Sequence, residues 1–190
     1  AFFRALAATV RAEDPTRLIS YAALYGIVGP IAEIVDVLGI NSYWGWYDKI
    51  WGGKGLAPGL EGERPREPRR EPIDLTPMRK MLDTVLANKR NLALLLTEFG
   101  ADSVPGSTSA SRDLWSENYH ADILREILSL AREYPQIVGT FPFCLSDYRD
   151  PSKVPNGYWN ELNLKGLVDY RRNRKLAFGA VSEAYRPAAP

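Results

Sequence analysis

Apolar and polar positions along the chain follow two different periods. Short apolar runs, typical of buried strands, occur at 17–24, 37–43, 91–99 and 136–148, and the run at 91–99 predicts a strand buried on both faces. Apolar residues recur at helical spacing at 1–12, 30–37, 74–90, 114–134 and 175–185. The predicted order is one helix followed by four strand–helix pairs. This order indicates an α/β fold with parallel strands joined by right-handed crossovers.

Two architectures fit that order. Four strands are too few for a closed (β/α)8 barrel of ~250 residues, but they could form an open doubly wound sheet. However, no glycine-rich phosphate loop follows the first strand, and no "GxxxxGK" motif occurs. Three strands instead end in polar and aromatic residues, "NSYWGWY", "TEFGAD" and "SDYRD". Because barrel enzymes keep their active site at that end of the strands, we predict that residues 1–190 are part of a TIM barrel, namely its second half, with strands five to eight and their helices.

The segment 48–73 differs in composition from the rest of the chain. It is rich in glycine and proline and ends in "EGERPREPRREP", in which positive and negative charges nearly cancel. We predict an exposed loop of polyproline character within the barrel domain, without chemistry of its own.

Charge and cysteine content exclude several classes of function. The net charge is +1, so the chain has no large excess of positive charge for binding nucleic acid. The single cysteine, Cys144, rules out an internal disulfide framework, and the single histidine, His120, argues against a histidine-based metal site. Aromatic residues make up 11% of the chain, which suits either a packed core or a sugar-stacking cleft.

No part of the sequence predicts a membrane span or a signal peptide. The most apolar stretch, 21–40, contains two glycines, a proline and two acidic residues. The N-terminal stretch has Arg4 within its apolar part and resembles an amphipathic helix. These features favour a soluble protein, in the cytoplasm rather than secreted.

Glu98 stands at the carboxyl end of the third predicted strand, and Tyr43 and Tyr47 follow the second strand. A carboxylate in this place could be the nucleophile of a retaining glycosidase, which needs a second carboxylate about 5–5.5 Å away as general acid/base. A neighbouring phenol would hydrogen-bond the nucleophile and keep it ionised. The residues alone leave another interpretation open, in which Glu98 is a buried acid paired with Arg112 or Lys165.

Four motifs favour the interpretation of Glu98 as a nucleophile. The stretches "LGINSYWGWYD" (38–48), "LLTEFGAD" (95–102), "RDLWSENYH" (112–120) and "NLKGLVDYRRNRKLAF" (163–178) resemble the catalytic barrel of glycoside hydrolase family 2 in order and approximate spacing. The resemblance covers nearly the whole chain and is nearest to the β-glucuronidases. It implies a retaining exo-β-glycosidase that hydrolyses β-D-glucuronides and needs no metal and no organic cofactor.

The resemblance also implies roles for individual residues. Glu98 matches the nucleophile, and Tyr43 matches the tyrosine that hydrogen-bonds near it. Asn41 and Tyr47 match pocket residues. The pair Asn163 and Lys165 matches the Asn-x-Lys motif that binds the carboxylate of the sugar acid, and an amide with an ammonium suits that ligand.

The sequence departs from the family pattern at three places. The family's general acid/base, a Glu after Asn at the tip of strand four, has no counterpart, because Asn160–Glu161 follows "PNGYW" rather than an apolar strand. Phe143 and Trp159 stand where familiar glucuronidases have Trp and Arg. A β-galactosidase-like substrate or another uronide therefore stays open.

Two further alternatives concern the molecule rather than its substrate. The chain could be a non-catalytic half-barrel, with exposed sheet edges, that pairs with the remainder of the barrel or forms a homo-oligomer. A lectin-like sugar binder is less favoured, because it would not explain Glu98 beside Tyr43. For three other residues we expect a structural or surface role for His120, a packed thiol at Cys144, and for Asp147 either a pocket role or an ion pair with Arg149.

Overall fold

The computed structural model describes residues 2–26, 29–50, 72–88, 91–153 and 159–186. The helices are α1 (Phe2–Glu13), α2 (Tyr47–Ile50), α3 (Thr76–Asn88), α4 (Glu117–Arg132) and α5 (Leu176–Ala184), with a 3₁₀-helix, η1, at Gly29–Glu33. The strands are β1 (Ser20–Leu24), β2 (Val37–Asn41), β3 (Ala93–Glu98), β4 (Ile137–Thr140), β5 (Tyr148–Arg149) and β6 (Leu162–Asn163).

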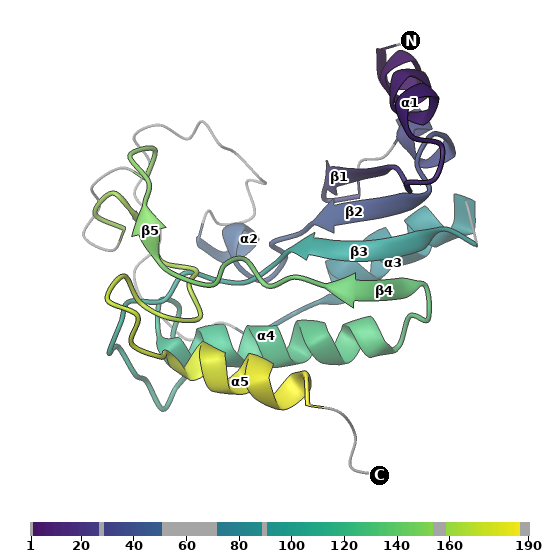
Figure 1. Cartoon of the computed structure of the whole chain (residues 1–190). Coiled ribbons are helices and arrows are strands. Elements are labelled where there is room, and N and C mark those ends of the chain that lie inside the picture. The colour runs from purple at the N-terminus through teal and green to yellow at the C-terminus, as the bar shows by residue number, and fades with distance from the viewer. Residues whose placement is uncertain (1, 27–28, 51–71, 89–90, 154–158, 187–190) are drawn as a thin grey trace.

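The first four strands form one parallel sheet in the order β1-β2-β3-β4. The predicted parallel α/β sheet is therefore confirmed. Neighbouring strands follow one another along the chain, without the reversal of order that defines a doubly wound sheet. Figure 1 shows that β2, β3 and β4 all point toward the side where α2 and β5 lie. The carboxyl ends of the strands and the loops after them therefore meet at this end of the molecule.

Helices α3 and α4 begin where side chains cap them. The Asp74 carboxylate accepts a hydrogen bond from the backbone N–H of Thr76 at 2.9 Å, and the Ser116 hydroxyl accepts one from that of Tyr119 at 3.1 Å. Such caps satisfy N–H groups that have no partner within the helix. Along α4, apolar residues at helical spacing, including Ile123 and Ile127, are buried in the core. The amphipathic helices predicted here are therefore confirmed.

The two faces of the parallel sheet differ in burial. One face is fully buried at Leu38, Ile40, Leu94 and Leu96. The alternate positions Val37, Ala93 and Leu95 are only half-buried, and Leu24 is 46% exposed. Figure 1 shows α3 behind the sheet and α4 and α5 below β4, with no described helix in front of the strands. The expectation that strand 91–99 is buried on both faces is thus wrong for this chain, although parallel sheets are normally covered on both sides.

Two predicted elements are shorter in the structure. The helix expected at 30–37 is only the 3₁₀-helix η1, because the backbone N–H of Asp36 bonds to the carbonyl of Ile19 at 2.9 Å and draws the chain into β2. The strand expected at 136–148 ends at Thr140, although the N–H groups of Phe141 and Phe143 still bond to the carbonyls of Leu96 and Phe99 at 2.8 and 2.9 Å. The later pairing of β5 with β6, which is antiparallel, had no signal in the sequence.

Most of the loop predicted at 48–73 lies outside the described residues. Its first residues belong instead to the helical turn α2, where Ile50 is buried, so the loop prediction is wrong for 48–50. No helix in the described ranges is both long and apolar enough to cross a membrane.

Candidate active site

The tips of β2 and β3 bring the predicted site residues together. Asn41 and Glu98 are partners in the strand register, and the Ser42 N–H bonds to the Glu98 carbonyl at 2.8 Å. The register shifts between Ile40 and Asn41, so the chain leaves β2 directly beside the end of β3. Tyr43 follows two residues later, and its side chain therefore reaches the Glu98 carboxylate.

Tyr43 and Glu98 form the central contact of the site. The Tyr43 hydroxyl donates a hydrogen bond of 2.7 Å to Glu98 Oε2. Burial raises the pKa of Tyr43 well above its ordinary value, and the hydrogen bond to Glu98 raises it further. The phenol therefore stays protonated and keeps donating, which stabilises a charged carboxylate.

The alternative partners predicted for Glu98 are engaged elsewhere. Arg112 pairs with Asp122 at 2.5 Å, and Lys165 pairs with Asp102. The interpretation of Glu98 as a buried acid paired with either of these cations is therefore wrong. Glu98 is half-buried, so its carboxylate is not sealed inside the core.

Lys165 is buried, and it does not lie in solvent as an ordinary loop lysine would. Its ammonium bonds to Asp102 Oδ2 and donates to the Tyr47 hydroxyl at 2.9 Å. Asp102 also accepts hydrogen bonds from Trp46 Nε1 at 2.8 Å and from the backbone N–H of Leu164 at 2.9 Å. Asp102 thus ties the loop that carries Lys165 to the segment after β2.

Opposing effects act on the Asp102 carboxyl. Burial by itself would raise its pKa, but the charges of Lys165 and Lys153 and the hydrogen bonds that it accepts lower the pKa overall. Asp102 is therefore a carboxylate at neutral pH. It balances one positive charge in a buried place where an unpaired ammonium would be costly.

Tyr47 links the lysines to the rest of the site. Its hydroxyl accepts from Lys165, and also from Lys153 at 3.0 Å. Its ring lies 5.1 Å from that of Tyr43, edge to face. Burial raises the pKa of Tyr47 to about 12, so its own proton remains available to a ligand oxygen.

The two asparagines of the predicted site contact other groups. Asn41 Oδ1 accepts a hydrogen bond of 2.7 Å from the Thr97 hydroxyl. Asn163 Nδ2 donates to the Tyr148 hydroxyl at 3.2 Å, and its Oδ1 accepts from the backbone N–H of Lys165. The side chains of Asn163 and Lys165 therefore bond to different tyrosines, although the two residues are joined through the backbone.

A second buried ion pair lies next to the first. Lys175 Nζ is 2.9 Å from Asp147 Oδ1, and it also donates to the carbonyls of Ser103 and Leu164, each at 2.9 Å. The predicted pair between Asp147 and Arg149 is wrong, since Arg149 pairs with Glu161 at 3.3 Å.

Neither His120 nor Cys144 is an exposed side chain. His120 is buried with its Nδ1 3.0 Å from the Ser103 hydroxyl, and burial lowers its pKa to about 3, so the ring is neutral. This fits the structural role expected for it. Cys144 is half-buried rather than packed in the core, and burial raises the pKa of its thiol to about 11.

Sequence reasoning missed Asp102, Trp46 and Lys153. Asp102 ends the motif "TEFGAD" at the carboxyl end of β3, a place where a polar residue should have been considered. Trp46 lies within "NSYWGWY", but nothing local shows that its indole turns toward Asp102. For Lys153 the sequence offers no signal, since its partner Tyr47 is 106 positions away.

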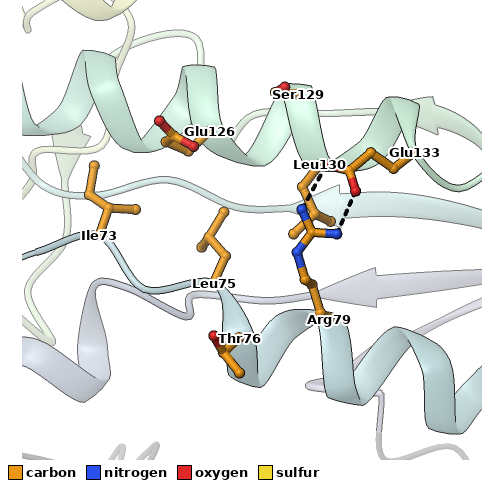
Figure 2. Close-up of a pocket in the computed structure, with 8 residues that line it drawn as sticks. All are labelled: Ile73, Leu75, Thr76, Arg79, Glu126, Ser129, Leu130 and Glu133. Carbon is orange, nitrogen blue, oxygen red and sulfur yellow. Dashed lines mark hydrogen bonds and ion pairs between the residues drawn. The ribbon is translucent and has the colours of Figure 1, made fainter.

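A groove between α3 and α4 lies apart from this site. Figure 2 shows Arg79 of α3 reaching across to Glu133, with hydrogen bonds of 2.5 and 2.6 Å. None of the predicted site residues lines the groove. We interpret it as a helix–helix junction closed by a surface ion pair. The described residues also contain no group of acidic, histidine or cysteine side chains that could hold a metal ion.

No protein-family model matches the chain. Its structure is similar to that of an FMN-binding β-glucuronidase from Faecalibacterium prausnitzii L2-6, with a TM-score of 0.74 and 24% identity over 98% of this chain and 26% of that protein. A β-galacturonidase of glycoside hydrolase family 2 from Eisenbergiella tayi, bound to galacturonate, gives 0.73 and 22% over 96% of this chain and 29% of that protein. A β-glucuronidase from Bacteroides uniformis gives 0.75 and 22% over all of this chain and 20% of that protein.

The chain thus spans less than a third of the length of these enzymes. At 22–24% identity the likeness establishes a common fold, and it agrees with the family that the four sequence motifs resemble. Residues 1–190 therefore share the fold of one part of the glycoside hydrolase family 2 glucuronidases and galacturonidases.

Proposed function

We propose that residues 1–190 carry the nucleophile side of the active site of a retaining exo-β-glycosidase, and that its substrates are β-D-glucuronides. The observation that carries this proposal is the hydrogen bond from Tyr43 to Glu98 at the tips of two adjacent parallel strands. The buried cation Lys165 lies near the same tyrosine, with its ammonium 5.4 Å from the centre of the Tyr43 ring. A carboxylate nucleophile and a cation for a sugar acid thus meet in one place.

In the proposed mechanism, Glu98 attacks the anomeric carbon while the glycosidic bond breaks. The leaving oxygen takes a proton from a general acid, and a covalent glycosyl ester forms on Glu98. The same acid group, now a base, removes a proton from water, which attacks the anomeric carbon and releases Glu98. Tyr43 donates to Glu98 and so favours its ionised form before attack.

We place the general acid/base on a strand outside residues 1–190. Glu161, the acid of the Asn-Glu pair, forms an ion pair with Arg149 and is half exposed in the turn before β6. The open face of the β1–β4 sheet supports this placement, because a barrel of eight strands would cover that face with side chains of the other half. The chain would then be strands five to eight of the barrel.

The test of the nucleophile is hydrolysis of p-nitrophenyl β-D-glucuronide by the full natural protein. We expect Glu98→Gln to lower kcat at least about a thousandfold, since removal of a nucleophile commonly costs that much or more. The matched control is Glu161→Gln, the same chemical change at the exposed ion pair, which should leave kcat within a few-fold. Mass spectrometry after reaction with a 2-deoxy-2-fluoro-glucuronide should find the sugar on Glu98.

Equal loss in the two variants, or a label on another residue, would reject Glu98 as nucleophile. The corresponding β-galactoside and β-galacturonide should be compared in the same assay. Faster hydrolysis of the galactoside would favour the β-galactosidase-like alternative.

A second candidate is a non-catalytic half-barrel that must assemble with another chain. The half-buried face of the sheet and the exposed residues of β1 and β4, among them Leu24 and Val138, favour it. Sedimentation of residues 1–190, alone and with the chain that carries the acid/base, tests this candidate. A stable monomer that binds no second half would exclude it.

A further inference from the structure

Two lysines from different segments meet at one phenol oxygen. Lys153 Nζ lies 3.0 Å from the Tyr47 hydroxyl, and Lys165 Nζ lies 2.9 Å from it. The two ammonium groups are therefore less than about 6 Å apart. Like charges that close repel each other in a partly buried site.

The position of Lys153 is fixed by its backbone. Its N–H donates to the carbonyl of Asp150 at 2.9 Å, and its carbonyl accepts from the N–H of Glu161 at 3.1 Å. These bonds tie Lys153 to residues just after β5 and just before β6, and its side chain extends toward Tyr47. The ammonium also lies over two rings, 4.4 Å from the centre of Trp159 and 5.2 Å from that of Tyr47.

Lys153 forms no ion pair within the described part of the chain. Asp102 pairs with Lys165. The Asp150 carboxylate accepts hydrogen bonds from Ser152, and its charge acts on Tyr47 without an ion pair to Lys153. Among the described residues, the Lys153 ammonium is therefore held by the Tyr47 hydroxyl and by two aromatic rings, which attract a cation without neutralising it.

Both ammonium groups have hydrogens that bond to none of the described residues. Within that part of the chain, Lys165 uses two of its three hydrogens, on Asp102 and Tyr47, and Lys153 uses one, on Tyr47. With the Tyr47 hydroxyl between them, they offer donors at the spacing that the two oxygens of one carboxylate can accept.

We propose that Lys153 is a second cationic anchor for the substrate's carboxylate, acting with Lys165 across Tyr47, and that it sets the preference for uronides over neutral glycosides. The inference rests on the proposed function, and it adds a residue to which neither the sequence motifs nor the comparisons assign a role. It also gives this chain a cation in the pocket, although Trp159 stands where the resemblance would place an arginine.

The test compares two substrates that differ only at C6, p-nitrophenyl β-D-glucuronide and p-nitrophenyl β-D-glucoside, in the full natural protein. We expect Lys153→Gln to lower the ratio of kcat/KM for glucuronide over glucoside about 10- to 100-fold, the effect of one charged hydrogen bond. Lys153→Arg, which keeps the charge, should restore most of the ratio. Arg149→Gln is the matched control, because it removes a positive charge from β5, close to Lys153 in the chain, where the side chain is 71% exposed.

A merely structural lysine would behave differently. If Lys153→Gln lowers activity on both substrates equally, or changes neither, while Glu98→Gln still abolishes hydrolysis, the inference is wrong and the proposed function stands. A drop in the ratio for Arg149→Gln as large as for Lys153→Gln would also overturn it, since the effect would then be long-range charge.

A binding experiment keeps the inference testable without turnover. D-glucuronate and D-glucose are titrated by NMR into the Glu98→Gln protein, with and without Lys153→Gln. We expect the lysine change to weaken glucuronate binding about tenfold or more and to leave glucose unchanged. Equal binding of glucuronate by both proteins would overturn the role of Lys153. No hydrolysis of any glycoside by the unchanged protein would instead reject the proposed function.

Discussion

Two buried Asp–Lys pairs lie side by side at the carboxyl end of the sheet, and they differ in what remains available to a ligand. They share Leu164, whose N–H donates to Asp102 and whose carbonyl accepts from Lys175. Lys175 has acceptors for all three of its hydrogens, in Asp147 and two backbone carbonyls. Among the described residues, Lys165 has only Asp102 and Tyr47 as acceptors. A saturated pair holds loops together, whereas an unsaturated one can also receive a substrate.

The carboxylates of the two pairs differ as well. Asp102 accepts from three donors, and its pKa is lowered in spite of burial. Burial raises the pKa of Asp147 from its ordinary value of 3.8 to about 6, although Lys175 acts in the opposite direction. Its Oδ2 has no hydrogen-bond partner within the described part of the chain. The carboxylate of the Asp147–Lys175 pair is therefore less well stabilised than that of the Asp102–Lys165 pair. We interpret the Asp147–Lys175 pair as a contact that holds loops together.

The largest expected effect tests the saturated pair. Lys175→Met removes the donor from three acceptors and leaves Asp147 unpaired, so we expect a loss of about 3–5 kcal/mol in the free energy of unfolding. Urea unfolding of the full natural protein measures it. The double change Lys175→Met with Asp147→Leu should regain much of this loss, because no buried charge is then left alone. No loss in the single variant would mean that the pair contributes nothing to holding the loops.

A smaller loss of stability is expected at the unsaturated pair. Lys165→Met leaves Asp102 with two donors, Trp46 and the N–H of Leu164, so we expect about 2–3 kcal/mol in the same urea experiment. Lys165→Met should also lose the preference for glucuronide over glucoside. The folded molecules of Lys175→Met should keep this preference. If Lys165→Met and Lys175→Met lose equal stability and neither changes the substrate preference, the proposed difference between the two ion pairs is wrong.

The smallest effect is a pH dependence that belongs to only one pair. Between about pH 4 and pH 6, Asp147 binds a proton in the folded state that it has already released in the unfolded state. Stability should therefore fall by about 2 kcal/mol as the pH rises through this window. Asp147→Asn should abolish that slope in urea unfolding at several pH values.

Asp102→Asn is the matched control for the pH experiment. The pKa of Asp102 is lowered below 3.8, so its contribution is present above that pH and is lost only as the pH falls further. The slope between pH 4 and pH 6 should therefore persist in this variant. If Asp102→Asn abolished it instead, the assignment of the two carboxyl groups would be reversed.

Much of the fold could be predicted because its signals are local. The apolar run before Glu98, the helical spacing of α4 and the cap at Asp74 each lie within a few residues. The predictions were wrong where a contact between residues distant in the sequence determined the local structure. Asp36 bonds to Ile19 rather than extending a helix, and among the described residues the second face of the sheet is only half-buried.

The sequence by itself determined the order of the parallel strands and the placement of Glu98 and Tyr43 at neighbouring tips, because strand period and chain order suffice for both. Only the tertiary structure decided which charges meet. Asp102 pairs with a lysine 63 positions away, and Tyr47 binds lysines 106 and 118 positions away. Those contacts depend on how loops after different strands pack against one another, and no local pattern encodes that packing. The physical reason is that an ion pair in a buried site is selected by its whole surroundings, which only the folded chain assembles.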